Sequence, residues 1–249
     1  MWQASEIAPT GIATPGVASG FAALDAELPD GGWPQGQLVE LLLDAPGVGE
    51  LSLLAPALAQ VARDRPCVWV LPCDDPATRV ATLPYPPALA EAGIAVERGI
   101  FVKPATPRES LWSLEQSLRT AHLGALIGWL PASSARDGDF RALRRLHLLA
   151  QRSRALVFLL RGTHAATAAS PASLRLQLAC SDGQLRVTLL KRRGRPLLEP
   201  VVLQVHPARW NDACVEMRPP EAPAKDRIIV SGTPALQARR WSLQSIFSH

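Results

Sequence analysis

The segment best placed to do chemistry is a glycine-containing turn that follows a short apolar run. It reads Asp44-Ala-Pro-Gly47-Val-Gly49-Glu50-Leu51. The spacing matches a phosphate-binding loop, G-x-x-x-x-G-K-[ST], in which backbone N–H groups surround the phosphates, a lysine contacts the β- and γ-phosphate oxygens and a hydroxyl binds Mg²⁺. Nucleotide binding is therefore the first chemistry to test against the residues present.

The positions that would supply charge or a metal ligand carry unsuitable residues. Asp44 stands at the first glycine position, and Glu50 at the lysine position. Leu51 takes the hydroxyl position, with Ser52 one place late, and the first lysine of the chain is Lys103. A carboxylate in place of the ammonium turns an attraction of about 4 kcal/mol, for unit charges roughly 4 Å apart, into repulsion. We predict a strand-to-helix turn without tight ATP binding, in which Glu50 itself satisfies the helix N-terminus.

No other segment supplies the missing groups. The apolar run that ends at Leu130 lacks the terminal Asp that ATPases use, because Gly128 or Trp129 takes its place. Asp74 and Asp75 are the nearest acids that could serve as a base, and residues of this type more often cap a helix or turn. The four cysteines form no C-x-x-C pair, which argues against a zinc site. The sequence predicts no catalytic residue, no metal and no cofactor.

The elements that hold the turn alternate between strand and helix. Short apolar runs predict strands at 39–43, 67–71, 100–102, 125–130 and 155–160. Helical spacing predicts helices at 51–63, from Thr106 through Leu118, and at 139–154. Thr106 and Glu109 form a predicted capping box, and the last helix is expected to turn Phe140, Leu143, Leu146 and Leu149 inward. This alternation predicts an α/β fold with a mostly parallel sheet covered on both faces.

The pattern changes after Gly162. Three strands at 174–179, 184–190 and 198–205 follow one another without helices, and Ser181 to Gln184 reads as a hairpin turn. We expect a β-meander at one edge of the sheet. The chain is thus divided into a lead-in segment, 1–36, a core, 37–206, and a proline-rich linker with a flexible tail, 207–249.

Composition narrows the class of protein. The chain has 249 residues, 47% of them hydrophobic, and a formal net charge of +4. The basic residues are nearly all arginines, which a GC-rich genome would explain. The beginning of the sequence does not have the form of a signal peptide, and no segment reads as a membrane span. These features predict a cytoplasmic protein, for which acidic or nucleic-acid partners are permitted but not required.

Two further segments carry a resemblance to a known superfamily. Gly20-Phe-Ala-Ala-Leu24-Asp25 is followed by Gly31-Gly32-Trp-Pro34-Gln-Gly36, which leads into the strand before the turn. This order resembles the entry to a RecA-family core. Within that superfamily the chain is most similar to the ImuA family, through Gly47 to Ser52, Trp129-Leu-Pro131 and the run from Gly162 to Leu176. The cell-division inhibitor SulA is similar through the same core.

The resemblance implies a RecA-like core and a role in SOS translesion synthesis. ImuA proteins accompany the polymerase-like protein ImuB, so the implied partners are ImuB, RecA and, through them, a specialised DNA polymerase and the sliding clamp. The degenerate loop then indicates a non-catalytic adaptor. The alternatives are a SulA-like inhibitor that binds FtsZ, a true ATPase and a direct DNA-binding protein.

Four surfaces are candidates for binding partners or DNA. Two are basic: the 139–154 helix with Arg141, Arg144 and Arg145, also readable as a solvated face, and the tip Lys191-Arg192-Arg193-Gly-Arg195. The third is the loop from Gly162 to Ser173, where RecA itself has a DNA-contacting loop, with basic residues Arg161, His164 and Arg175 nearby. The fourth is the tail with Trp241, Ile246 and Phe247, which either anchors a partner or packs on its own domain.

Overall fold

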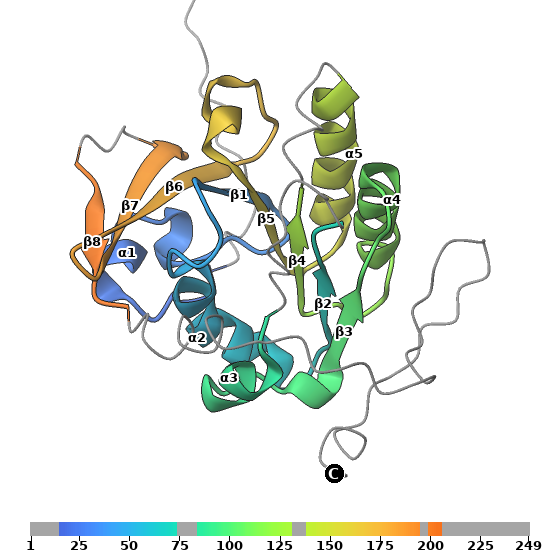
Figure 1. The fold of residues 1–249 in the computed structure, drawn as a ribbon, viewed down its shortest axis with the longest axis horizontal. Coiled ribbons are helices and arrows are strands. Elements are labelled where there is room, and N and C mark those ends of the chain that lie inside the picture. The colour runs from blue at the N-terminus through green and yellow to red at the C-terminus, as the bar shows by residue number, and fades with distance from the viewer. Residues whose placement is uncertain (1–14, 74–83, 131–137, 195–198, 206–249) are drawn as a thin grey trace, which may run out of the picture.

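The computed structural model describes residues 15–73, 84–130, 138–194 and 199–205. Eight strands lie within these ranges: β1 Leu38–Leu43, β2 Cys67–Val70, β3 Gly99–Val102, β4 Ala125–Trp129, β5 Leu156–Gly162, β6 Leu174–Ser181, β7 Gln184–Lys191 and β8 Val201–Leu203. They form one sheet in the order β3-β2-β4-β5-β1-β6-β7-β8 (Figure 1). The predicted α/β class is confirmed.

The helices follow the predicted alternation. They are α1 Ala22–Asp25, α2 Glu50–Ala62, α3 Pro86–Glu91, α4 Pro107–Ser117 and α5 Gly138–Arg152, with short 3₁₀ turns η1 Pro29–Gly31, η2 Val96–Arg98 and η4 Thr163–Thr167. Within the described ranges, no helix has the length and apolar character needed to cross a membrane.

The sheet is parallel from β3 to β6 and antiparallel beyond. β1 pairs in parallel with both β5 and β6, whereas β7 and β8 add antiparallel strands at one edge. The hairpin between β6 and β7 turns at Asp182 and Gly183, which have φ angles of 53° and 71°, as expected for a two-residue turn with left-handed backbone. The predicted meander is therefore confirmed.

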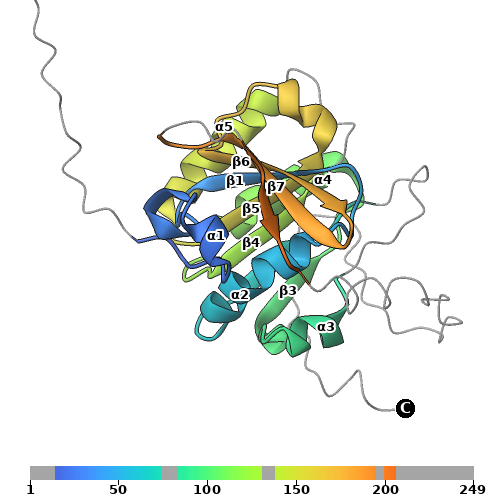
Figure 2. The same cartoon turned by 90° about the vertical axis from the view of Figure 1, so that its left-hand side faces the viewer.

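Helices cover both faces of the sheet (Figure 2). One apolar cluster joins α2 and α3 to Ile127 and Trp129 of β4, and a second joins α4 and α5 to Leu126 and Leu130. Alternate side chains of β4 thus enter opposite layers, as the period of a strand requires. β1 is buried along its whole length, which explains its nearly continuous apolar sequence.

The lead-in residues share the first of these clusters. Val17 pairs with Trp33 through an isolated antiparallel bridge, and Trp33 packs edge-on against Phe158 of β5 with ring centroids 5.2 Å apart. Residues 15–36 therefore contribute side chains to the core. The division at 36 and 207 stays a prediction, and the linker and tail lie outside the described residues.

Two local expectations need correction. Thr106 caps α4 by accepting a hydrogen bond from the Glu109 N–H, but the Glu109 carboxylate accepts from the Ala105 N–H instead of closing the box on Thr106. Phe140 is 41% exposed, so its inward assignment was wrong. The buried stripe of α5 is formed by Ala142, Leu143, Leu146 and Ala150, and Phe140 lies at the edge of that stripe in the first turn.

Candidate functional site

The turn after β1 joins a buried strand to the start of a helix through two glycines with left-handed backbone. β1 lies between β5 and β6 and delivers the chain to the turn, after which α2 begins at Glu50. Gly47 and Gly49 have φ angles of 88° and 109°, a left-handed conformation that glycine adopts far more readily than other residues. A Cβ on Gly49 would also lie 3.1 Å from Val205 Cγ2. Both glycines are therefore required by the shape of the turn.

The carboxylate of Glu50 fills this turn. Its Oε1 accepts a hydrogen bond of 2.9 Å from the Gly47 N–H, and its Oε2 accepts from the Gly47 and Gly49 N–H groups, both at 3.2 Å. Glu50 is only 2% exposed. Backbone N–H groups at the positive end of a helix are a common binding site for anions, and here they bind the carboxylate of Glu50. The carboxylate thus serves as the anion of the turn, as the sequence predicted for the helix N-terminus.

The other positions of the loop are also committed to the fold. Asp44 is exposed and accepts a hydrogen bond from the Thr163 hydroxyl at the start of η4, which ties the turn to the end of β5. Leu51 packs against the apolar core. The Ser52 hydroxyl is buried and has no hydrogen-bond partner in the described part of the chain. The apolar Leu51 side chain cannot ligate a metal, and the Asp44 carboxylate already accepts a hydrogen bond from Thr163.

The carboxyl end of β4 holds a tryptophan where ATPases place an acid. Trp129 is 6% exposed and lies in the same apolar cluster as α2. It stacks on Trp69 with ring centroids 6.4 Å apart. Gly128 faces the opposite layer, where a Cβ would clash with the Leu114 side chain. Neither Trp129 nor Gly128, the two residues predicted at the acidic position, therefore offers a carboxylate.

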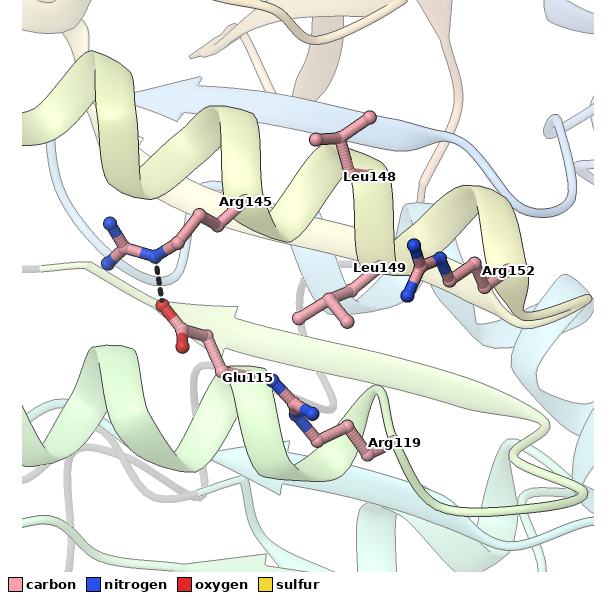
Figure 3. A pocket seen from close by; sticks show the side chains of 6 residues that line it. All are labelled: Glu115, Arg119, Arg145, Leu148, Leu149 and Arg152. Atoms are coloured by element: carbon pink, nitrogen blue, oxygen red, sulfur yellow. Dashed lines mark hydrogen bonds and ion pairs between the residues drawn. The ribbon is translucent and has the colours of Figure 1, made fainter.

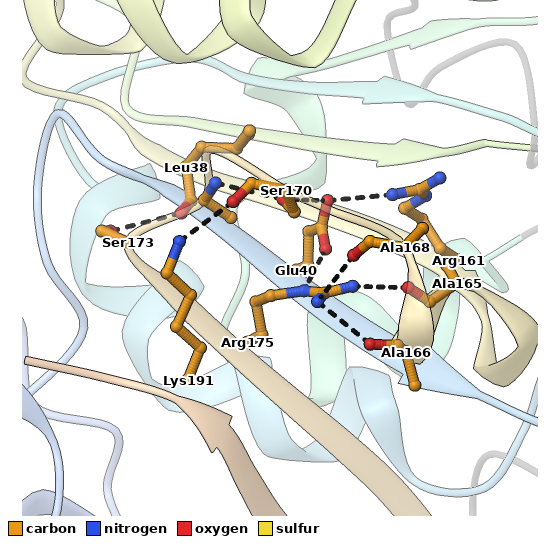
Figure 4. Close-up of polar contacts among 11 residues, drawn as sticks. Leu38, Glu40, Arg161, Ala165, Ala166, Ala168, Ser170, Ser173, Arg175 and Lys191 are labelled. Atoms are coloured by element: carbon orange, nitrogen blue, oxygen red, sulfur yellow. Dashed lines mark hydrogen bonds and ion pairs between the residues drawn. The ribbon is translucent and has the colours of Figure 1, made fainter. Parts of the chain in front are cut away.

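A buried ionic cluster is centred on Glu40 of β1, the strand that precedes the turn (Figure 4). Glu40 is fully buried; its Oε1 accepts from Arg161 Nη1 at 3.0 Å and from the Ser170 hydroxyl at 2.9 Å. Its Oε2 accepts from Arg175 Nε at 2.7 Å. Arg175 also donates to the carbonyls of Ala165, Ala166 and Ala168. One carboxylate and two guanidinium groups thus fix the segment between β5 and β6 against β1.

This cluster corrects the prediction for the Gly162–Ser173 loop. The sequence places Arg161 and Arg175 as basic residues near a predicted DNA-contacting loop, but they are 6% and 7% exposed and face Glu40. Only His164 of that set is exposed. Sequence reasoning missed Glu40, although a lone acid in a buried apolar strand requires a cation partner.

Two basic side chains of the tip between β7 and β8, Lys191 and Arg192, form hydrogen bonds within the protein. Lys191 Nζ donates to the Ser170 carbonyl at 3.0 Å. Arg192 Nη1 donates to the Glu27 carbonyl and carboxylate at 2.6 Å and 2.7 Å, and its side chain is 9% exposed. Arg193 is exposed, whereas Arg195 lies outside the described residues. Arg192 is therefore held by Glu27 within the protein and is not the exposed cation that was predicted, whereas Lys191 is exposed and its contact with a partner stays a prediction.

The arginines of α5 are on the surface, as predicted. Arg141, Arg144 and Arg145 are exposed, and Arg145 Nε donates to Glu115 of α4 at 2.9 Å. Trp241, Ile246 and Phe247 lie outside the described residues, so their role stays a prediction.

Two ionisable side chains outside the turn have shifted pKa values. Burial raises the pKa of the Cys67 thiol to about 12, although a backbone hydrogen bond at Ala125 and the charge of Arg65 oppose this. Burial, followed by the positive charge of Lys191, lowers the pKa of His147. Both effects are structural consequences of packing.

The sequence matched no protein-family model and no curated protein. The interpretation of the turn therefore depends on its own geometry and on the motifs of the chain.

Proposed function

We propose that this chain is a non-catalytic adaptor with a RecA-like core, and that it acts in DNA-damage-induced translesion synthesis. One observation carries the proposal: the Glu50 carboxylate occupies the turn where a nucleotide would place its phosphates. A second anion there would face a buried negative charge in place of a lysine. The expected consequence is a protein that does not bind ATP tightly and does not hydrolyse it.

The architecture is consistent with that core. The mostly parallel sheet and the glycine turn after its β1 strand suit a nucleotide-binding fold that has lost its ligand. Trp129 at the end of β4 gives no carboxylate for Mg²⁺, which supports the same conclusion. Loss of chemistry with retention of the fold favours a role in binding other proteins.

The partners follow from the resemblance to the ImuA family. They are ImuB and RecA in the cytoplasm, with a specialised DNA polymerase and the sliding clamp reached indirectly. The surfaces that we assign to these partners are the α5 face with Arg141, Arg144 and Arg145, and the tail residues Trp241, Ile246 and Phe247. Lys191, Arg193 and Arg195 of the β7–β8 tip are the further candidates for DNA or partner contact.

A capture experiment with three purified proteins tests this function. The full chain, immobilised through a tag, is exposed separately to ImuB, RecA and FtsZ. We expect capture of ImuB and RecA, and weaker capture of one of them by the full chain carrying Trp241→Ala, Ile246→Ala and Phe247→Ala. Capture of FtsZ alone would favour the division-inhibitor alternative, and capture of none of the three would overturn the adaptor function.

A further inference from the structure

A groove lies between α4 and α5 on the face of the sheet opposite α2 (Figure 3). It has a volume of about 190 Å³ and is lined by Glu115 and Arg119 on one side and by Arg145, Leu148, Leu149 and Arg152 on the other. The two helices are joined across it by the Arg145–Glu115 ion pair of 2.9 Å. Leu149 points between the helices, and the arginines border it.

Each helix carries a stripe of surface side chains, and Glu115, Arg145, Leu148 and Arg152 of these stripes line the groove. On α5 the stripe consists of Arg141, Arg145, Leu148 and Arg152, spaced so that all four share one helix face. Leu148, in the middle of these arginines, is 49% exposed. Half of its surface is thus left in water among the arginines.

The stripe of α4 also places basic residues around one exposed apolar side chain. Arg108, Trp112 and Glu115 recur at the spacing that places side chains on one helix face, and Arg119, two residues after the helix ends at Ser117, completes the stripe. Trp112 is 48% exposed. Of the six exposed large hydrophobic side chains among the described residues, three lie on these two helices: Trp112, Phe140 and Leu148. Trp112 and Leu148 thus give each stripe one exposed apolar side chain, whereas Phe140 belongs to neither stripe.

The two stripes together are strongly basic. They hold five arginines and one glutamate, and that glutamate is already paired with Arg145. Glu109 of α4 belongs to neither stripe, and its carboxylate accepts a hydrogen bond from the Ala105 N–H at the helix start. A molecule that binds these stripes must therefore carry acidic groups at its edges to pair with the arginines, and apolar groups along its centre to cover Leu148 and Trp112.

We propose that this groove binds an acidic amphipathic helix of a partner protein. α5 has 15 residues, so the groove can accommodate a helix of about four turns, on the order of 22 Å long. Leucine-type side chains of the occupant would cover Leu148, Leu149 and Trp112, and flanking carboxylates would face the arginines, which is the helix-in-groove mode of recognition.

Two other occupants fit less well. Duplex DNA would meet the arginines, but its phosphate backbone gives no apolar cover to Leu148 and Trp112. The chain's own segment 206–249 carries six basic and four acidic residues, so its net charge has the same sign as that of the groove. An acidic partner helix satisfies both the charge and the apolar surface.

The inference rests on the proposed adaptor function and names a docking surface for it. We test it by fluorescence anisotropy with the full chain and a labelled 16-residue peptide that has leucines at helical spacing flanked by glutamates. The scrambled peptide of the same composition is the matched probe. We expect saturable binding of the amphipathic peptide only, weakening as salt is raised.

Paired variants locate the binding site. Leu148→Ser with Arg152→Glu changes the groove, and Leu190→Ser with Arg186→Glu makes the same changes at exposed positions of β7. The groove variant should bind the peptide at least about tenfold more weakly, as expected for an interface centre, while the β7 variant should match the unaltered chain. Circular dichroism confirms that both fold.

Several results would overturn the groove assignment. These are equal binding of the scrambled peptide, equal loss in both variants, tighter competition by a labelled duplex DNA, or tighter peptide binding when Trp241, Ile246 and Phe247 are changed to alanine, which would assign the groove to the chain's own tail. Failure of the peptide with retained capture of ImuB and RecA would refute the groove alone. Peptide binding without such capture would refute the adaptor function alone.

Discussion

Removal of the Glu50 carboxylate should both destabilise the protein and open an anion site. Glu50→Ala retains good helix propensity but deletes the acceptor for the Gly47 and Gly49 N–H groups. Hydrogen bonds to a charged group contribute about 1.5–3 kcal/mol each, and the interaction with a helix N-terminus adds about 0.3–1 kcal/mol. Gly47 is exposed and water can replace part of its bond. We therefore expect the free energy of unfolding to fall by about 2–3 kcal/mol.

The variant should then recover stability from an added anion. At tenfold excess over its dissociation constant, phosphate would restore about 1.4 kcal/mol to Glu50→Ala by mass action. The unaltered chain should gain nothing beyond a general salt effect, because its turn already holds a carboxylate. The control is sodium chloride at equal ionic strength.

Urea unfolding with and without phosphate measures both effects. Glu97→Ala, at an exposed acid in η2, is the matched substitution and should change stability by no more than about 0.5 kcal/mol. If Glu50→Ala is as stable as the unaltered chain, or if phosphate stabilises both proteins equally, the carboxylate does not act as the anion of the turn and the reasoning fails.

Three further predictions concern the rest of the fold. Glu40→Ala should lower the free energy of unfolding by about 3–5 kcal/mol, because it removes the buried carboxylate that accepts from both the Arg161 and the Arg175 guanidinium groups; a loss below about 1 kcal/mol in urea unfolding would contradict this. Because the Cys67 pKa is raised to about 12 in the folded chain, its contribution to stability is full below the ordinary thiol pKa and is lost as pH rises toward 12. Cys67→Ala should therefore flatten the alkaline part of the stability profile, and an Ellman assay at pH 8 should label the exposed Cys180 but not Cys67 in the native state. Arg192→Ala should cost about 1–3 kcal/mol through its lost bonds to Glu27, whereas Arg193→Ala should be neutral; equal effects in thermal melts would count against the assignment.

The sequence predicted the layers of the fold because the apolar pattern has a clear period. Runs such as β1 and β5 are nearly all apolar, apart from the paired Glu40 and Arg161, because both faces of the sheet are covered. Helix signals such as Thr106 depend only on neighbouring residues. The turn after β1 was also readable, since glycine spacing reports backbone conformation directly. Phe140 was misplaced because the edge of a helical stripe depends on how far the neighbouring helix extends.

The candidate site was less accessible to sequence reasoning because it depends on contacts between distant residues. Arg161 and Arg175 look like surface charges until β5 and β6 bring them to Glu40, more than a hundred residues away in the chain. Arg192 likewise meets Glu27 only through the folded lead-in segment. The groove between α4 and α5 could not be predicted from the sequence, because it forms only when the two helices pack side by side and the Arg145–Glu115 ion pair joins them.

Calorimetric titration of the full chain with ATP and Mg²⁺ tests the central claim most directly, with a working P-loop ATPase titrated alongside. Our account predicts no heat of binding for this chain at nucleotide concentrations up to the millimolar range. Saturable, Mg²⁺-dependent binding at low micromolar concentration would mean that Glu50 leaves the turn for the triphosphate, and the account would be wrong.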